Sequence, residues 1–265
     1  MSTSTTASST PWDGVIFGSV TLLGAVVTTL CLIRARRTPT VANRSITAAF
    51  GICTLGVFFA VPAIAQAAAD ITGIDNIAKL IAHICAVLWS AGLQFTMVDI
   101  AYGPYGLRTR LYQRATFAGA ILMAMIPLWL SANGPGVEFT TAHAHDVKVR
   151  IYLLLYLVYV FATCTELTFQ CALASRDNWP ERPWSSFGYG SSTIAAIFGM
   201  GYAASKASYL VAYTMGSPWE LRVEERLSPL LSGISILFLF VGLTLPVFGW
   251  LLRKILKRPE PAPRA

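Results

Sequence analysis

Charged residues are scarce in this chain of 265 residues. Asp, Glu, Lys and Arg make up 12% of the sequence, and hydrophobic residues make up 55%. An ordinary soluble domain carries about 25% charged residues. The composition therefore excludes a soluble globular domain, and it also excludes a disordered chain, which is poor in apolar side chains. The sequence predicts a protein that is embedded in a membrane.

The signatures of several other protein classes are absent as well. The five cysteines lie in apolar stretches and form no CxxC pair, so neither a disulfide framework nor a thiolate metal site is indicated. The net charge of +7 comes from short basic clusters between apolar runs, which does not favour nucleic acid as a partner. The motifs of phosphate-binding loops, zinc proteases and serine hydrolases are missing. We expect no cofactor, and the motifs assign no catalytic residue.

Seven apolar runs are long enough to cross a bilayer, whose apolar core of about 30 Å needs roughly 20 helical residues. They lie at 14–33, 46–69, 80–101, 115–133, 151–174, 189–213 and 229–252. We therefore expect an all-α, polytopic membrane protein, with one seven-helix transmembrane domain over 14–252 and the lipid bilayer as its partner. Pro62, Pro127 and Pro246 predict kinks in the second, fourth and seventh helices.

The basic residues alternate between the two sides of this predicted bundle. Lys and Arg gather in the connections 34–45, 102–114 and 175–188, whereas acidic residues favour the other connections. Cytoplasmic connections of membrane proteins are enriched in Lys and Arg. The pattern therefore predicts a short extracellular N-terminal segment at 1–13 and a basic cytoplasmic tail at 253–265.

Lys206 stands inside the sixth apolar run, about seven residues from its outer end. An ionisable group at this depth usually faces the bundle interior or a wet cavity, where it can serve a ligand, an ion or a proton relay. Alternatively, its long side chain reaches toward the surface and pairs with a carboxylate. Tyr202 and Tyr209 lie on the same helical face, so both hydroxyls are candidates to line one polar pocket with Lys206.

Two acidic residues complete the set of charges inside the runs. Glu166 lies in the fifth run, and Asp99 lies near the cytoplasmic end of the third. Glu166 and Lys206 are separated by about 12 Å along the membrane normal, which is too far for a direct ion pair. A pathway through Lys206, Glu166 and Asp99 is one hypothesis. For Asp99 we favour a simpler interpretation, an interfacial salt bridge with Arg108 or Arg110.

The histidines give weaker signals. His83 opens the third run near the outer side, and we favour a packing role for it over a ligand-binding role. The external sequence from His143 to Asp146 offers two imidazoles and a carboxylate to a metal ion. No further strong ligand lies close in sequence, so no metal site is predicted.

Three stretches of the sequence resemble a known family. They are FAVPAIAQAAADITGIDNIAKLIAH, GYAASKASYLVAY and SPLLSGISILFLFVGLTLPVFGW. They are similar to seven-helix actinobacterial membrane proteins that are classed as transporters without a known substrate. The resemblance implies a bacterial plasma membrane, and it makes His83 and Lys206 the matching polar positions. Many members carry a further cytoplasmic domain after the seventh helix, which is not expected here because the sequence ends at Ala265.

Three classes of function stay open at this point. Transport or binding of a small molecule or an ion is favoured, because Lys206 and Glu166 lie inside the runs. A signalling role with a membrane or cytoplasmic protein partner is the second, because the connections are short and one side is basic. The third, a lipid- or terpene-modifying enzyme, needs two acids in one cavity. The different depths of Glu166 and Asp99 argue mildly against it.

Overall fold

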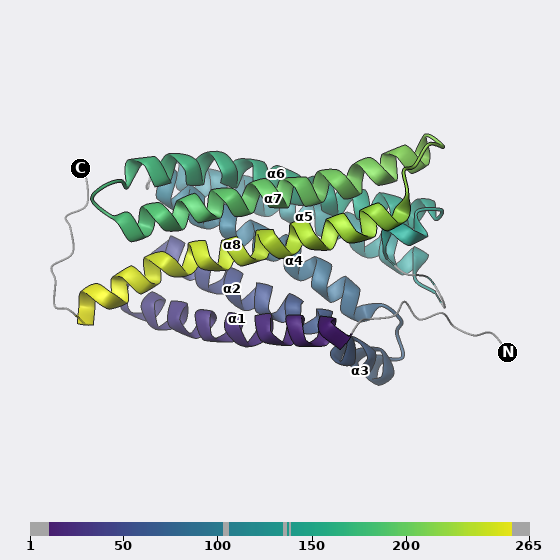
Figure 1. Ribbon diagram of the computed structural model, residues 1–265, viewed down its shortest axis with the longest axis horizontal. Helices are drawn as coiled ribbons and strands as arrows, with labels where there is room; N and C mark the ends of the chain where they lie inside the picture. Colours follow the sequence, from purple (N-terminus) through teal and green to yellow (C-terminus); the bar gives the residue numbers. More distant parts are fainter. Residues whose placement is uncertain (1–10, 103–105, 135–136, 138, 256–265) are drawn as a thin grey trace.

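The structure, a computed structural model, describes residues 11–102, 106–134, 137 and 139–255. Within these residues the chain forms eight α-helices and one short 3-10 helix, and it contains no strand. The long helices run side by side along one axis and form a bundle (Figure 1). The predicted all-α class is therefore confirmed for the described residues. Most of the predicted N-terminal segment and tail, 1–10 and 256–265, lies outside them.

The seven long helices alternate in direction along the chain (Figure 1). The bounds of all the described helices are α1 (Pro11–Arg37), α2 (Val41–Ala60), α3 (Pro62–Thr72), α4 (Ile77–Tyr102), α5 (Leu107–Ala132), η1 (Thr141–His143), α6 (Val147–Asp177), α7 (Pro183–Thr214) and α8 (Leu221–Ile255). Among the described helices, seven are long and apolar enough to cross a membrane, and α3 is not among them. Large apolar side chains such as Leu22, Met123 and Phe169 are exposed on the bundle surface. The chain is therefore a multi-pass membrane protein whose outer faces contact lipid.

The second apolar run is divided into two helices rather than kinked. Val61, between α2 and α3, has an extended backbone, and Pro62 follows as the first residue of α3. A proline fits there because the first residues of a helix need no intrahelical donor. The helices α5 and α8 continue through Pro127 and Pro246. The kinks that we expect at those two positions stay a prediction.

Several helices extend beyond the apolar runs at their ends. The fourth run begins at residue 115, but α5 begins at Leu107, and the seventh run begins at residue 229, but α8 begins at Leu221. Arg114 and Glu224, which the sequence pattern places in connections, therefore lie in helices. Hydropathy marks only the part of a helix that lies in hydrocarbon, whereas hydrogen bonding extends the helix past it.

Small residues allow the helices to approach one another closely. α7 packs along α8, and α2 packs along α4. A Cβ atom on Gly188 of α7 would lie 2.5 Å from the carbonyl oxygen of Gly242 in α8. A Cβ atom on Gly92 of α4 would lie 2.9 Å from the Cβ of Ala49 in α2. Close backbone contact through small residues is typical of helix packing in membranes.

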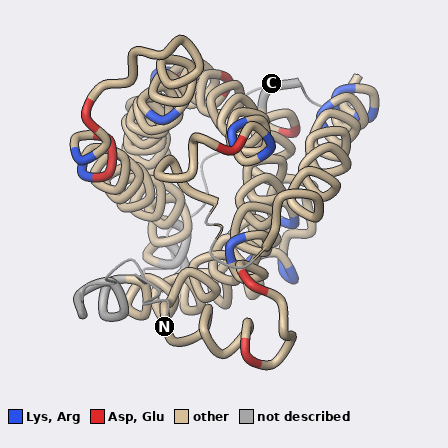
Figure 2. Tube along the Cα trace, turned by 90° about the vertical axis from the view of Figure 1, so that its right-hand side faces the viewer, with Lys and Arg blue, Asp and Glu red and all other residues tan. Residues whose placement is uncertain are grey.

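The connections α1–α2, α4–α5 and α6–α7 lie at one end of the bundle, and the remaining connections lie at the other (Figure 1). The end-on view in Figure 2 shows that most of the helical trace is uncharged. The basic clusters of the sequence therefore belong to one end of the bundle. Which end faces the cytoplasm stays a prediction.

Candidate functional site

Helix α6 carries two adjacent stripes of polar side chains. Tyr152, Tyr156 and Thr163 are spaced by four and seven residues, and the second stripe, with Tyr159 and Glu166, follows the same spacing. Residues at these spacings lie on one helical face. The first stripe faces a cavity, and the second faces α4 and α5.

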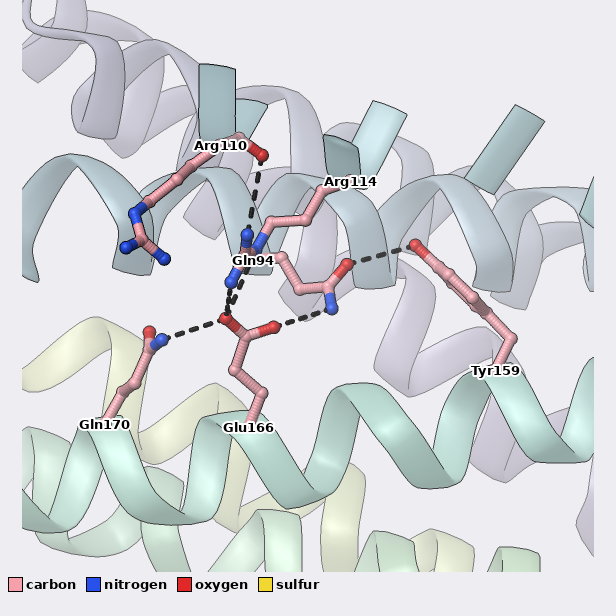
Figure 3. Close-up of polar contacts among 6 residues, drawn as sticks. All are labelled: Gln94, Arg110, Arg114, Tyr159, Glu166 and Gln170. Atoms are coloured by element: carbon pink, nitrogen blue, oxygen red, sulfur yellow. Dashed lines mark hydrogen bonds and ion pairs between the residues drawn. The ribbon is translucent and has the colours of Figure 1, made fainter. Parts of the chain in front are cut away.

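The Glu166 cluster consists of Gln94 from α4, Arg114 from α5, and Tyr159, Glu166 and Gln170 from α6 (Figure 3). Glu166 Oε1 accepts hydrogen bonds from Arg114 Nε at 3.1 Å, from Arg114 Nη2, and from Gln170 Nε2 at 2.9 Å. Glu166 Oε2 accepts from Gln94 Nε2 at 2.8 Å. The Tyr159 hydroxyl donates to Gln94 Oε1 at 3.2 Å.

This cluster joins three helices through one neutralised charge. The side chains of Arg114 and Glu166 are 18% and 20% exposed, so the ion pair is largely withdrawn from the surface. Buried charges are tolerated when they are paired and their remaining lone pairs are bonded. Both oxygens of Glu166 are occupied by donors, so the cluster is a structural link between α4, α5 and α6.

The Glu224 cluster consists of Thr141 from η1, Lys206 from α7, and Glu224 and Ser228 from α8. Glu224 is 1% exposed. Its Oε2 accepts from Thr141 Oγ1 at 2.5 Å, and its Oε1 accepts from Ser228 Oγ. Lys206 Nζ lies 4.0 Å from Oε1. The Glu224 carboxylate therefore links the loop that contains η1 to α7 and α8.

Lys206 thus has a carboxylate partner, as the structural interpretation of this residue requires. Its Nζ atom also lies 5.7 Å from the centroid of the Tyr202 ring, within the range of a cation–π contact. Tyr209 packs its ring against Trp219 at 5.6 Å between centroids. Of the two tyrosines expected beside Lys206, the structure brings Tyr202 to the ammonium group and places Tyr209 against Trp219.

Asp99 has a different partner from the one we expect. Its Oδ2 accepts a hydrogen bond from the backbone N–H of Ala42 at 2.8 Å, in the first turn of α2. None of the described ion pairs involves Asp99, so the favoured salt bridge with Arg108 or Arg110 is replaced by this contact. A carboxylate suits the free N–H groups at a helix start. The sequence alone does not show that α2 begins beside the end of α4.

His83 is held by α6. Its Nδ1 lies 2.9 Å from the Tyr152 hydroxyl, and its ring stacks on Tyr156 at 4.7 Å between centroids. These contacts agree with the packing role that we favour. His83 also lines a cavity.

A cavity of about 300 Å³ lies between α1, α2, α4, α6, α7 and α8. Its lining is largely apolar, and none of the described lining residues is Asp, Glu, Lys or Arg. Its polar and aromatic wall is formed by His83, Trp89, Ser90, Tyr156, Thr163 and Tyr202. Binding sites for small molecules commonly combine an apolar wall with a few polar groups.

The six candidate residues divide between these sites. His83 and Tyr202 line the cavity, whereas the other four candidates, Lys206, Tyr209, Glu166 and Asp99, are not among its lining residues. Glu166, Lys206 and Asp99 each bond to different partners, and the structure does not join them into one chain of contacts. Asp99 and Glu166 do not form the pair of acids that an enzyme of the third class needs.

In the sequence from His143 to Asp146, the aspartate caps a helix. Asp146 Oδ1 accepts from the backbone N–H groups of Lys148 at 2.7 Å and of Val149 at 3.4 Å, which caps the start of α6. In the described part of the chain, no group of three or more metal-ligating side chains comes together.

Comparisons with known proteins add no assignment. A scan against protein-family models, a search of curated proteins and a search of solved structures each found no match to this chain. The resemblance to the actinobacterial membrane proteins therefore stays a prediction.

Proposed function

We propose that this membrane protein binds a small, mostly apolar molecule in the cavity between α1, α2, α4, α6, α7 and α8, as a step in carrying it through the membrane. The cavity itself carries the proposal, because it is apolar, lies between the spanning helices and is lined by side chains from six of them. A wall contributed by several helices changes shape when those helices move against one another, as transport requires. A signalling role is supported only by the sequence, through its short connections and the basic residues on one side.

The cavity cysteines supply a test of binding. Cys164 lines the cavity. With the protein in a lipid nanodisc, we expect naphthalene to slow the reaction of Cys164 with N-ethylmaleimide several-fold, as measured by peptide mass spectrometry. Phe169→Cys gives a matched control on the same helix, because Phe169 is 68% exposed to lipid. The rate at this control position should not change when naphthalene is added.

A pair of variants identifies the cavity as the place of binding. Ala86 lines the cavity, so Ala86→Phe should fill it and remove the protection of Cys164 by naphthalene. Leu88 lies on the same helix but faces outward, so Leu88→Phe should leave the protection unchanged. Protection that survives in Ala86→Phe, or none in the unaltered protein, would refute binding at this cavity.

The proposal includes an orientation in the bacterial plasma membrane, with the N-terminus outside and the C-terminus in the cytoplasm. It is supported by the basic residues at one end of the bundle. Both His145 and Arg108 are exposed, and they lie at opposite ends of the bundle. A membrane-impermeant maleimide added to whole cells should therefore label His145→Cys and spare Arg108→Cys. The reverse pattern would invert the topology.

A further inference from the structure

Three polar groups of the cavity wall lack a hydrogen-bond partner within the described protein. Thr163 is 1% exposed, and its hydroxyl has no partner. Ser90 is 6% exposed, and no described hydrogen bond involves its hydroxyl. His83 bonds through Nδ1 to Tyr152, which leaves Nε2 without a bond to any described residue. All three residues line the same cavity.

Other hydroxyls in the spanning helices behave differently. Many of them donate to the backbone carbonyl four residues earlier, and examples are Thr28, Thr54, Thr96 and Thr168. The two remaining cavity serines also have acceptors, because Ser232 donates to the carbonyl of Pro229 and Ser235 to that of Ala195. Buried polar groups without a partner are uncommon in folded proteins, and each one calls for an explanation. A polar group on a bound ligand would supply the missing hydrogen-bond partner.

The surroundings exclude a charged ligand. A charge placed in this apolar space would lose its hydration without gaining a counter-ion, which is strongly unfavourable. The two nearest clusters offer no help, because Glu166 is neutralised by Arg114 and Lys206 lies beside Glu224. The ligand is therefore neutral.

The apolar wall favours a ring. Trp89, Tyr156 and Tyr202 line the cavity, and Phe17 from α1 adds a fourth aromatic side chain. Flat aromatic surfaces pack well against aromatic ligands, in stacked or edge-on arrangements. His83 extends this surface because its ring already stacks on Tyr156.

We propose that the ligand is a neutral aromatic compound with a hydroxyl or carbonyl group that bonds to Ser90 or Thr163. His83 lies seven residues from Ser90 along α4, about 10 Å by helix rise, so it bonds a second such group at the other end of the ligand. The imidazole suits either group. When Tyr152 donates to Nδ1, Nε2 carries the proton and donates to a carbonyl, and in the other tautomer Nε2 accepts from a hydroxyl. This inference rests on the proposed function and names the class of ligand for the same cavity.

Three probes that share one ring system test this class. They are naphthalene, 1-naphthol and 1-naphthoate, and their binding is measured by protection of Cys164 in nanodiscs, with concentrations corrected for partition into lipid. A hydrogen bond contributes about a fivefold gain in affinity. We therefore expect 1-naphthol to bind at least about fivefold more tightly than naphthalene. The charged 1-naphthoate should bind about tenfold more weakly than 1-naphthol, or not at all.

Variants then locate the polar contact. Thr163→Val keeps the shape of the side chain but removes its hydroxyl, so it should reduce the preference for 1-naphthol over naphthalene by about fivefold. Thr165→Val on the same helix is the matched control, because the Thr165 hydroxyl bonds to the carbonyl of Phe161 and does not line the cavity. It should leave the preference unchanged.

The outcomes separate this inference from the proposed function. Equal affinity for naphthalene and 1-naphthol in the unaltered protein would overturn the ligand class while leaving the binding cavity in place. Tighter binding of 1-naphthoate would overturn it as well, since it would require a positive charge in the cavity. If none of the three probes protects Cys164, both proposals fail.

Discussion

Two glutamates inside the bundle are stabilised in different ways. Glu166 is 20% exposed, and its Oε1 accepts from two nitrogens of the Arg114 guanidinium, with two glutamine amides completing its bonds. Glu224 is 1% exposed, yet its close donors are two neutral hydroxyls, and its ammonium partner Lys206 is 4.0 Å away. The more deeply buried carboxylate thus has the more distant cation.

The difference shows what each carboxylate depends on. A guanidinium supplies several donors in a fixed plane, so one arginine provides a carboxylate with both an opposite charge and hydrogen bonds. A lysine at 4.0 Å supplies charge, and the hydrogen bonds to Glu224 must come from elsewhere. We therefore expect the Glu166 cluster to depend mainly on its cation and the Glu224 cluster mainly on its hydroxyls.

The largest effect is expected for Arg114→Met. The substitution leaves Glu166 as an unpaired charge between three helices, which should lower the free energy of unfolding by about 3 kcal/mol. The measurement is reversible unfolding in mixed detergent with the protein at neutral pH. Arg108→Met is the matched control, because Arg108 lies on the same helix and is exposed. Its effect should stay within about 0.5 kcal/mol.

A second substitution shows whether charge is the cause. Adding Glu166→Gln to Arg114→Met removes the unpaired charge but keeps an acceptor and a donor among the glutamines, so most of the lost stability should return. No recovery in the double variant would mean that Arg114 acts by packing, and the contrast with Glu224 would lose its basis.

A medium effect is expected for Thr141→Val. The variant keeps the shape of the side chain but removes a donor to the buried Glu224, at a cost of about 2 kcal/mol. Thr140 is the neighbouring control, because its hydroxyl is buried and has no partner within the described protein. Thr140→Val should therefore be neutral or slightly stabilising, as thermal unfolding can show. Equal losses in the two variants would contradict the role given to the Thr141 hydroxyl.

The fold was predictable from the sequence because it depends on a property that is summed over many residues. Seven apolar runs predict seven spanning helices, and each spanning helix is present in the described residues. The break at Val61 was harder to foresee, because Pro62 permits either a kink or a new helix. The backbone on both sides decides between these outcomes.

The site was less predictable because it depends on where each helix begins and on how each helix is rotated about its own axis. Hydropathy assigns Arg114 and Glu224 to connections, yet Arg114 lies within α5 and Glu224 lies in the first turn of α8. Both bond to residues on other helices. The different depths of Glu166 and Lys206 along the membrane normal do predict that they are not partners. This agrees with their separate contacts. The cavity depends on which face of α4 meets α6, and no spacing along one chain segment shows that.

The smallest effect is expected for Lys206→Met. Because Lys206 Nζ is 4.0 Å from Glu224 and two hydroxyls already bond that carboxylate, the loss of stability should be below that of Thr141→Val. In a Glu224→Gln background the same substitution should have almost no effect, since a double-mutant cycle removes the pair energy. Lys206 does not line the cavity, so protection of Cys164 by naphthalene should be unchanged. Loss of that protection with full stability would instead make Lys206 a ligand-binding residue, and the structural interpretation of its pairing with Glu224 would be wrong.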